Sequence, residues 1–192
     1  MPASHETALE LALLGRAETL LRGFPRTPED EVVLLFDELR SPLLRYTVSL
    51  GVNVSDGEDL IQETFLSLFR HLRLGRGRSN LRGWLFRVTH NLALKHRNSH
   101  RQRDASSVSA LTLAERQPDR STNPEEELAE RQRQERLLAV MSALPEQDQN
   151  CLRLRAEGLR YREIAQALGM SLGAVSNSLV RSFERLNRAD AR

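Results

Sequence analysis

Forty consecutive residues near the middle of the chain contain no Asp or Glu. This stretch, residues 64–103, carries ten Arg or Lys side chains, although the whole chain of 192 residues has a net charge of only +2. Basic side chains can neutralise phosphates, and an aromatic face such as that of Trp84 can stack on an unpaired base. The segregated charge therefore indicates a polyanionic partner. A solvated basic face would also explain a charge run by itself, so the flanking motifs decide between the two.

The sequence contains no pattern typical of an enzyme or of a metal centre. It has no nucleophile–base motif and no glycine loop for phosphates. His71, His90, His96 and His100 are scattered through the basic stretch, and the pair at 96 and 100 has no carboxylate close by in sequence. We therefore predict no catalytic residue, no metal and no cofactor. The single Cys151 excludes an internal disulfide, and its apolar surroundings predict a buried structural thiol.

The composition is typical of a helix-rich globular protein. Hydrophobic residues make up 40% of the chain, whereas aromatic residues make up only 5%, which argues against a large sheet. No segment approaches the ~18 consecutive apolar residues that a membrane span needs. Residues 1–10 lack the basic and apolar regions of a signal peptide. These features predict a cytoplasmic protein without membrane insertion.

The elements that must position the basic stretch are predicted from apolar spacing and helix-start signals. A first helix begins near Pro28 with acidic residues in its first turn, and Pro42 opens a second. A capping box over residues 55–58, with Ser55 at the cap, starts a third helix. A fourth helix covers residues 81–96.

Composition changes after this fourth helix. Residues 98–124 are rich in Ser, Thr, Gln and Pro, which predicts a flexible linker without a core of its own. Helical spacing resumes at residue 125, and Pro145 fits the start of another helix. The sequence thus predicts an all-α protein with two small helical domains, residues 29–97 and 125–192, joined by this linker. Residues 1–28 form an N-terminal extension without an assigned role.

Residues 160–186 have the layout of a helix-turn-helix. Ile164, Ala165 and Leu168 are predicted to form the buried face of its first helix. Gly169 fits a left-handed turn, and Ser171 fits the cap of the second helix. The buried face of that second helix is predicted from apolar residues three or four positions apart: Val175, Leu179, Phe183 and Leu186. Such a second helix lies in the major groove of DNA.

Two segments together resemble extracytoplasmic-function sigma factors. Residues 59–65, Asp-Leu-Ile-Gln-Glu-Thr-Phe, and residues 80–93, from Asn80 through Trp84 to Ala93, are similar to the second conserved region of that family. The Leu144-Pro145 start and the helix-turn-helix at 161–180 are similar to its fourth region. The resemblance covers about residues 29–97 and 128–187, in the family order.

The resemblance implies a subunit that binds core RNA polymerase and directs promoter recognition, melting and initiation. It also implies an anti-sigma factor as a candidate partner. The positions that match polymerase docking are Asp59, Gln62, Glu63 and Phe65. The positions that match reading and melting of the minus-ten element are Asn80, Arg82, Trp84, Arg87, Asn91, Lys95 and Arg97. Reading of the minus-35 element would fall to Ser171, Ala174, Ser176, Asn177, Ser178, Arg181 and Arg185.

Two features leave alternatives open. Trp84 has helical spacing with Leu81, Leu85 and Val88, which favours a core position over a base platform. Ser176 and Ser178 stand where recognition helices of the family commonly carry basic residues. A sigma-like interaction module that does not initiate transcription would accommodate that departure. A helix-turn-helix regulator that is not a polymerase subunit would explain residues 144–187 but would leave the pattern at 59–97 as coincidence.

Overall fold

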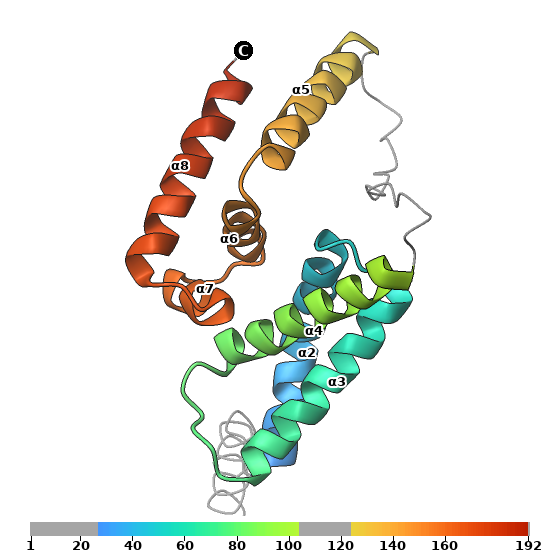
Figure 1. Cartoon of the computed structure of the whole chain (residues 1–192), viewed down its shortest axis with the longest axis vertical. Helices are drawn as coiled ribbons and strands as arrows, with labels where there is room; N and C mark the ends of the chain where they lie inside the picture. Colours follow the sequence, from blue (N-terminus) through green and yellow to red (C-terminus); the bar gives the residue numbers. More distant parts are fainter. Residues whose placement is uncertain (1–26, 104–123, 192) are drawn as a thin grey trace, which may run out of the picture.

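The computed structural model describes residues 27–103 and 124–191, which form seven α-helices and no strand. The first domain comprises α2 (Pro28–Ser49), α3 (Val54–Arg73) and α4 (Leu81–Arg103). The second comprises α5 (Pro124–Ser142), α6 (Glu146–Ala156), α7 (Tyr161–Leu168) and α8 (Leu172–Asp190). Figure 1 shows the three helices of the first domain at one end of the molecule and α5 and α8 at the other. The all-α fold class is confirmed for these residues.

The first helix of the first domain is longer than predicted. The Oγ1 of Thr27 accepts a hydrogen bond from the Asp30 backbone N–H at 3.1 Å, which caps α2 beside its acidic first turn. Pro42 lies inside α2, so the prediction that it opens a separate helix is wrong. An internal proline costs about 3 kcal/mol. Fully burying Leu39, Leu43 and Tyr46 on one face contributes about 1.5–3 kcal/mol for each large apolar side chain, which outweighs that cost.

The start of α3 also differs from its prediction. The cap is Asn53 rather than Ser55, and its Oδ1 accepts a hydrogen bond from the Asp56 backbone N–H at 2.9 Å. The predicted cap at Ser55 is therefore wrong, because Asn is as good a cap as Ser and Asn53 comes two residues earlier. The consequence is that Asp56 lies in the first turn of α3, where the helix dipole favours its charge.

The core of the first domain lies between α2, α3 and α4. Tyr46 and Phe86 are fully buried with their ring centroids 5.6 Å apart. The Tyr46 hydroxyl is 2.8 Å from Nδ1 of His90, so both buried polar groups have a partner. Burial lowers the pKa of His90, and the nearby charge of Arg97 adds to that effect against the opposing influence of Glu146. This core fixes the rotation of α4 and therefore decides which of its side chains face outward.

The predicted linker and N-terminal extension are only partly described. α4 continues to Arg103, six residues into the segment predicted as a linker from residue 98. The rest of that prediction, residues 104–123, and nearly all of the extension, residues 1–26, lie outside the described residues.

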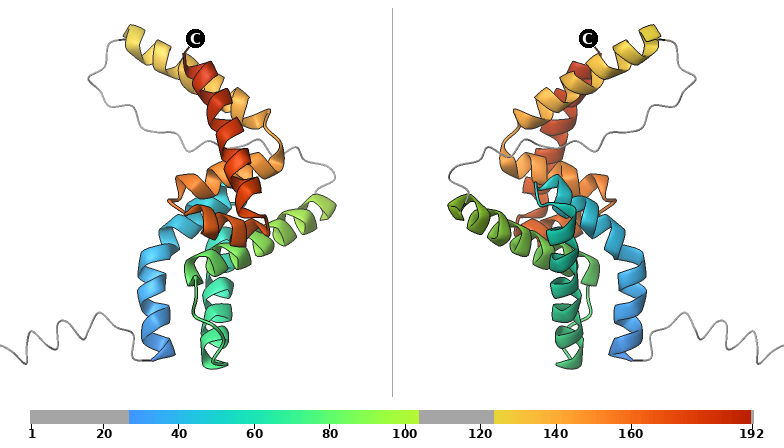
Figure 2. Two further views of the ribbon diagram at one scale, coloured as in Figure 1. Left: turned by 90° about the vertical axis from the view of Figure 1, so that its left-hand side faces the viewer. Right: turned by 90° about the vertical axis from the view of Figure 1, so that its right-hand side faces the viewer.

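The second domain contains the predicted helix-turn-helix, formed by α7 and α8. α6 packs against both helices, and buried Cys151 of α6 is 3.7 Å from the sulfur of Met170 in the turn. The prediction of a buried thiol is confirmed, and burial raises its pKa. α5 and the far end of α8 extend away from the first domain (Figure 2), where Arg133 and Asp190 form an ion pair. None of the described helices is both long and apolar enough to cross a membrane.

Candidate nucleic-acid and protein interface

One face of α3 carries polar side chains that point away from the core. Asp59, Gln62 and Glu63 are exposed, and residue spacings of three and four place them on one side of the helix. Leu66, which is 56% exposed, continues the same row one turn further on. The row, called here the α3 row, combines carboxylates, an amide and an apolar side chain, which suits a basic helical protein partner.

Phe65 does not belong to the α3 row. It is 5% exposed, and its ring lies edge-on to that of Phe36 with centroids 5.0 Å apart. The prediction that Phe65 is a docking residue therefore places a core side chain on the surface and is corrected here. Leu66 was missed in its place, although the spacing of seven from Asp59 was available in the sequence.

The outward face of α4 carries a basic and aromatic stripe. Trp84, Arg87, Asn91 and Lys95 follow one another at spacings of three, four and four, which places them along one side of the helix. Arg87, Asn91 and Lys95 are exposed. Trp84 is half-buried against the core, and its ring lies 4.8 Å from that of His71. This stripe, called here the open face, presents phosphate-binding groups next to a partly accessible aromatic ring.

The remaining minus-ten candidates lie elsewhere, at the contact between the two domains. Nη2 of Arg82 donates a hydrogen bond to the Glu157 carbonyl at 3.0 Å. Nη2 of Arg97 donates to Glu146 at 2.8 Å. The Asn80 amide bonds to Gln166 of α7. We call these three residues the covered set, although only Arg82 and Arg97 are half-buried and Asn80 stays exposed. The structure therefore does not bring all seven predicted residues onto one surface, because the covered set contacts the second domain.

The covered set is held by packing of α7 along α4 and by one further ion pair, Arg45 with Glu157 at 2.7 Å. Arg97 also donates to the Leu50 carbonyl of its own domain at 3.2 Å. Among the described residues, the buried Nε groups of Arg82 and Arg97 have no hydrogen-bond partner. An unsatisfied buried donor costs about 1–3 kcal/mol. The protein groups that cover these guanidinium groups therefore satisfy them incompletely.

The helix-turn-helix has the predicted turn. Gly169 adopts a left-handed conformation with φ of 66° at the end of α7, and the Ser171 hydroxyl accepts from the Ala174 backbone N–H at 3.1 Å to cap α8. Ile164, Val175 and Leu179 are fully buried, as predicted. The predicted buried faces need correction on both helices. On α7, Ala167 is buried where Ala165 and Leu168 are only half-buried; on α8, Phe183 is 43% exposed and Leu186 is half-buried.

The recognition helix offers fewer groups to DNA than predicted. Ser178 is 1% exposed and donates a hydrogen bond to the Asp148 carboxylate at 2.7 Å, so its assignment to base reading is corrected. Arg181 pairs with the same carboxylate at 3.3 Å. Ser171, Asn177 and Arg185 are exposed, whereas Ala174 and Ser176 are half-buried. The sequence could not reveal that Ser178 and Arg181 bond to Asp148, because Asp148 lies thirty residues before Ser178, on α6.

The fold and these surfaces define a class of protein: a two-domain helical protein with an acidic row and a basic stripe on its first domain and a helix-turn-helix in its second. Comparison with known sequences agrees. The Sigma-70 region 2 family matches residues 35–103. The Sigma-70, region 4 family matches residues 134–186. The chain belongs to the extracytoplasmic-function sigma factor family.

Individual relatives are similar over most of this chain. "Probable RNA polymerase sigma factor RfaY" of Xanthomonas campestris is 33% identical over 68% of this chain and 33% of its own length. "ECF RNA polymerase sigma factor SigE" of Mycolicibacterium smegmatis is 31% identical over 85% of this chain and 64% of its own length. The chain thus spans less than two thirds of the length of each of these two relatives.

A solved structure shares the fold. The sigma factor RpoE of Bartonella quintana, solved in complex with the anti-sigma factor NepR, is 20% identical, with a TM-score of 0.58 over 84% of this chain and 94% of that one. At this identity the similarity establishes the fold alone.

Proposed function

We propose that the chain is a dissociable sigma subunit, which binds core RNA polymerase and directs it to promoters. One observation carries the proposal: the first domain presents the acidic α3 row and the basic open face on different helices. A protein partner and a nucleic acid can therefore engage the same domain at the same time. We infer that the protein catalyses no reaction itself and acts in the cytoplasm, where its polymerase partner is found.

The α3 row is the proposed polymerase-docking surface. Asp59 and Glu63 provide charge that a basic helical partner can pair with, and exposed Leu66 provides an apolar contact at the end of the row. Charged pairs set the rate and register of association, whereas an apolar side chain that loses its contact with water contributes affinity. We infer that docking depends on Leu66 as well as on the polar residues.

The open face is the proposed minus-ten surface. Arg87 and Lys95 are placed to bind phosphates on either side of Asn91, whose amide can bond to a base edge. Strand separation also requires a pocket or platform for an unstacked base. Half-buried Trp84, at one end of the open face, supplies an aromatic surface there while its other side packs on the core.

The covered set joins this surface only after the domains separate. Arg82, Arg97 and Asn80 bond to the second domain, so promoter phosphates and the second domain compete for the same groups. Because the two buried Nε donors lack partners, replacing the protein contacts by phosphate oxygens satisfies more of each guanidinium. We infer that promoter binding is coupled to opening of the domain contact.

The second domain is proposed to read the minus-35 element through the exposed groups of α8, Ser171, Asn177 and Arg185. Ala174 and Ser176 lie between them and contribute at most apolar or water-mediated contacts. Arg181 is 61% exposed although it pairs with Asp148, so its guanidinium can reach a phosphate at the edge of the groove. An anti-sigma factor is a proposed regulatory partner, since the similar RpoE structure was solved with one.

The decisive experiment is in-vitro transcription on fragmented genomic DNA with purified bacterial core polymerase, with and without the full chain, followed by sequencing of RNA 5′ ends. Discrete new start sites with a shared pair of upstream elements are expected. Core binding without new starts would favour the interaction module. DNA binding without core binding would favour a helix-turn-helix regulator outside the polymerase.

A paired variant tests the docking surface directly. Q62A together with E63Q should weaken binding to core polymerase in a pull-down titration, whereas D37N, an exposed acid on α2 outside the row, should not. Equal affinity of the two variants for core polymerase would refute the assignment of the α3 row.

A further inference from the structure

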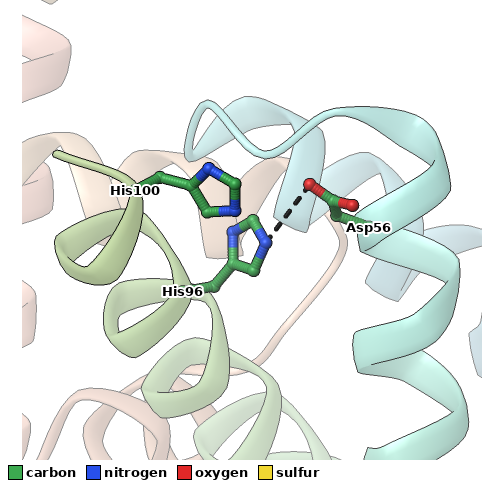
Figure 3. A group of neighbouring side chains, drawn as sticks. All are labelled: Asp56, His96 and His100. Atoms are coloured by element: carbon green, nitrogen blue, oxygen red, sulfur yellow. Dashed lines mark ion pairs between the residues drawn. The ribbon is translucent and has the colours of Figure 1, made fainter. Parts of the chain in front are cut away.

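Two histidines and one aspartate meet where the start of α3 lies beside the last turns of α4. Nε2 of His96 is 3.2 Å from Oδ2 of Asp56, and the His96 and His100 ring centroids are 4.3 Å apart. One ligand atom from each of the three residues lies within 4.8 Å of the other two. Figure 3 shows both imidazole rings on α4 with Asp56 approaching from α3. The proposed function uses none of these three side chains.

The geometry points to a binding site for a divalent transition-metal ion, with Zn²⁺ as the best match, formed by Asp56, His96 and His100. Zinc binds imidazole nitrogen and carboxylate oxygen at about 2.0–2.2 Å in a tetrahedral arrangement. Two tetrahedral ligands at such distances are roughly 3.3 Å apart. The His96–Asp56 separation of 3.2 Å already has that value, so only the exposed His100 ring must move closer.

The backbone arrangement suits such a site. His96 and His100 lie four residues apart on one helix, a spacing that places two imidazoles over the same surface, as in helical zinc motifs. Asp56 lies in the first turn of α3, which packs against α4. Three protein ligands leave a fourth position for water, which is the pattern of open rather than closed zinc sites.

Asn53 holds the aspartate in place. Its side-chain N–H donates to Oδ2 of Asp56 at 2.6 Å, while its own Oδ1 accepts from the Asp56 backbone N–H. Outer groups that orient a ligating carboxylate are typical of metal sites. Asp56 and His96 are also partly shielded, with side chains 32% and 24% exposed, which strengthens their interaction with a cation.

An ordinary ion pair explains less of this arrangement. A charged His96 would pair with Asp56 but would need no second imidazole beside it, and a charged His100 ring at 4.3 Å would repel it. A shared metal ion uses a lone pair on each ring and supplies the positive charge that Asp56 requires. The site would also link α3 to the end of α4, next to Arg97 of the covered set.

The test is isothermal titration calorimetry, in which ZnCl2 is titrated into the untagged full chain after EDTA treatment and removal of the EDTA. One ion per chain should bind, and Co²⁺ used as a spectroscopic probe should give visible absorption bands typical of tetrahedral coordination. Loss of one ligand in H96Q, H100Q or D56N should raise the Kd for Zn²⁺ by at least ~10-fold. H71Q, which removes a histidine outside the cluster, should bind like the wild type.

A fourth variant tests the role of Asn53. N53S keeps an oxygen that caps α3 but loses the amide donor to Asp56, so it should weaken Zn²⁺ binding less than the ligand variants do. Circular dichroism establishes that each variant is folded. The proposal is overturned if the wild type binds no Zn²⁺, or if H96Q and H100Q bind it as tightly as the wild type or as H71Q.

Discussion

The two sides of α4 carry the same kinds of residue but offer them differently. On the open face, Arg87 and Lys95 are exposed, with Asn91 between them. On the side that meets the second domain, Arg82 donates to the carbonyl of the residue that caps the C-terminus of α6, and Arg97 donates to a carboxylate of α6. Asn80, just before α4, bonds to α7. Both sides were predicted from sequence as one minus-ten surface.

The difference shows that residue type and helical spacing do not settle availability. An arginine is fully available to a promoter only when its own chain leaves the guanidinium exposed, and that depends on packing between elements far apart in sequence. The polar groups of the open face are exposed in the structure. We propose that the covered set becomes available when the second domain leaves α4, which would couple domain arrangement to promoter affinity.

The largest effect is expected from the open face. R87A together with K95A should weaken binding to a promoter fragment roughly 100-fold, because each charge-assisted hydrogen bond contributes about 1.5 kcal/mol or more. The slope of log K against log salt should fall by about 2, one for each phosphate contact. Fluorescence anisotropy of the holoenzyme on labelled promoter DNA at several salt concentrations measures both quantities.

The matched control is R131A with R136A, which removes two exposed arginines from α5. It should leave affinity and slope near the wild-type values. If the two double variants behave alike, the open face is only a solvated basic surface.

A smaller effect is expected when the domain contact itself is weakened. R45A with E146Q removes one partner of each ion pair between the domains, Arg45 with Glu157 and Arg97 with Glu146. Exposed pairs contribute at most about 1 kcal/mol each, so promoter affinity of the holoenzyme should rise only a few-fold. Small-angle X-ray scattering of the free chain should show a larger radius of gyration.

This double variant separates two interpretations of the covered set. If its residues bind DNA after opening, affinity rises as the domains separate. Unchanged affinity despite a larger radius would mean that Arg82 and Arg97 serve only the contact between domains.

Local signals in the sequence predicted the helix-turn-helix well. The left-handed turn at Gly169 and the cap at Ser171 depend on residues within a few positions of each other, and both are confirmed. The predicted cap of α3 at Ser55 was wrong, because Asn53 two residues earlier is an equally good cap. The prediction that Pro42 opens a new helix was wrong, because the burial of Leu39 and Leu43 on either side of it outweighs the tendency of proline to end a helix.

Long-range contacts were not predictable from one sequence. Phe65 and Leu66 are adjacent apolar residues, and only the position of α2 decides that Phe65 is core and Leu66 is surface. Ser178 is polar and lies among predicted base-reading residues, but Asp148 of α6 binds it. Asp56 lies forty residues before His96, so the cluster that they form with His100 was invisible until α3 and α4 were packed together.

The same contrast between available and occupied groups applies to α8. S178A should lower the free energy of unfolding of the second domain by about 1 kcal/mol, since it removes one hydrogen bond to a buried carboxylate that keeps Arg181 as a partner. Promoter affinity should stay unchanged. N177A, which alters an exposed amide on the same helix, should reduce affinity for the minus-35 element without lowering stability.

Chemical denaturation and anisotropy on the same two variants provide the measurement. Loss of promoter affinity in S178A at full stability would show that Ser178 turns outward to read DNA, contrary to its buried position.

The smallest effect concerns pH and the core behind the covered set. Burial lowers the pKa of His90 below its usual value of 6.5, so the unfolded chain takes up a proton at a higher pH than the folded domain does. The stability that depends on neutral His90 is therefore fully present above pH 6.5 and is lost as the pH falls through the lowered folded pKa. H90Q cannot take up that proton, so its unfolding free energy should fall less steeply between about pH 7.5 and pH 5, a range that spans the usual histidine pKa. Urea denaturation at several pH values compares the two slopes, which cancels the contribution of other titrating groups.

Parallel slopes in the wild type and H90Q would show that His90 is protonated equally easily in the folded and unfolded states. The core behind the covered set would then be more open to water than its burial indicates.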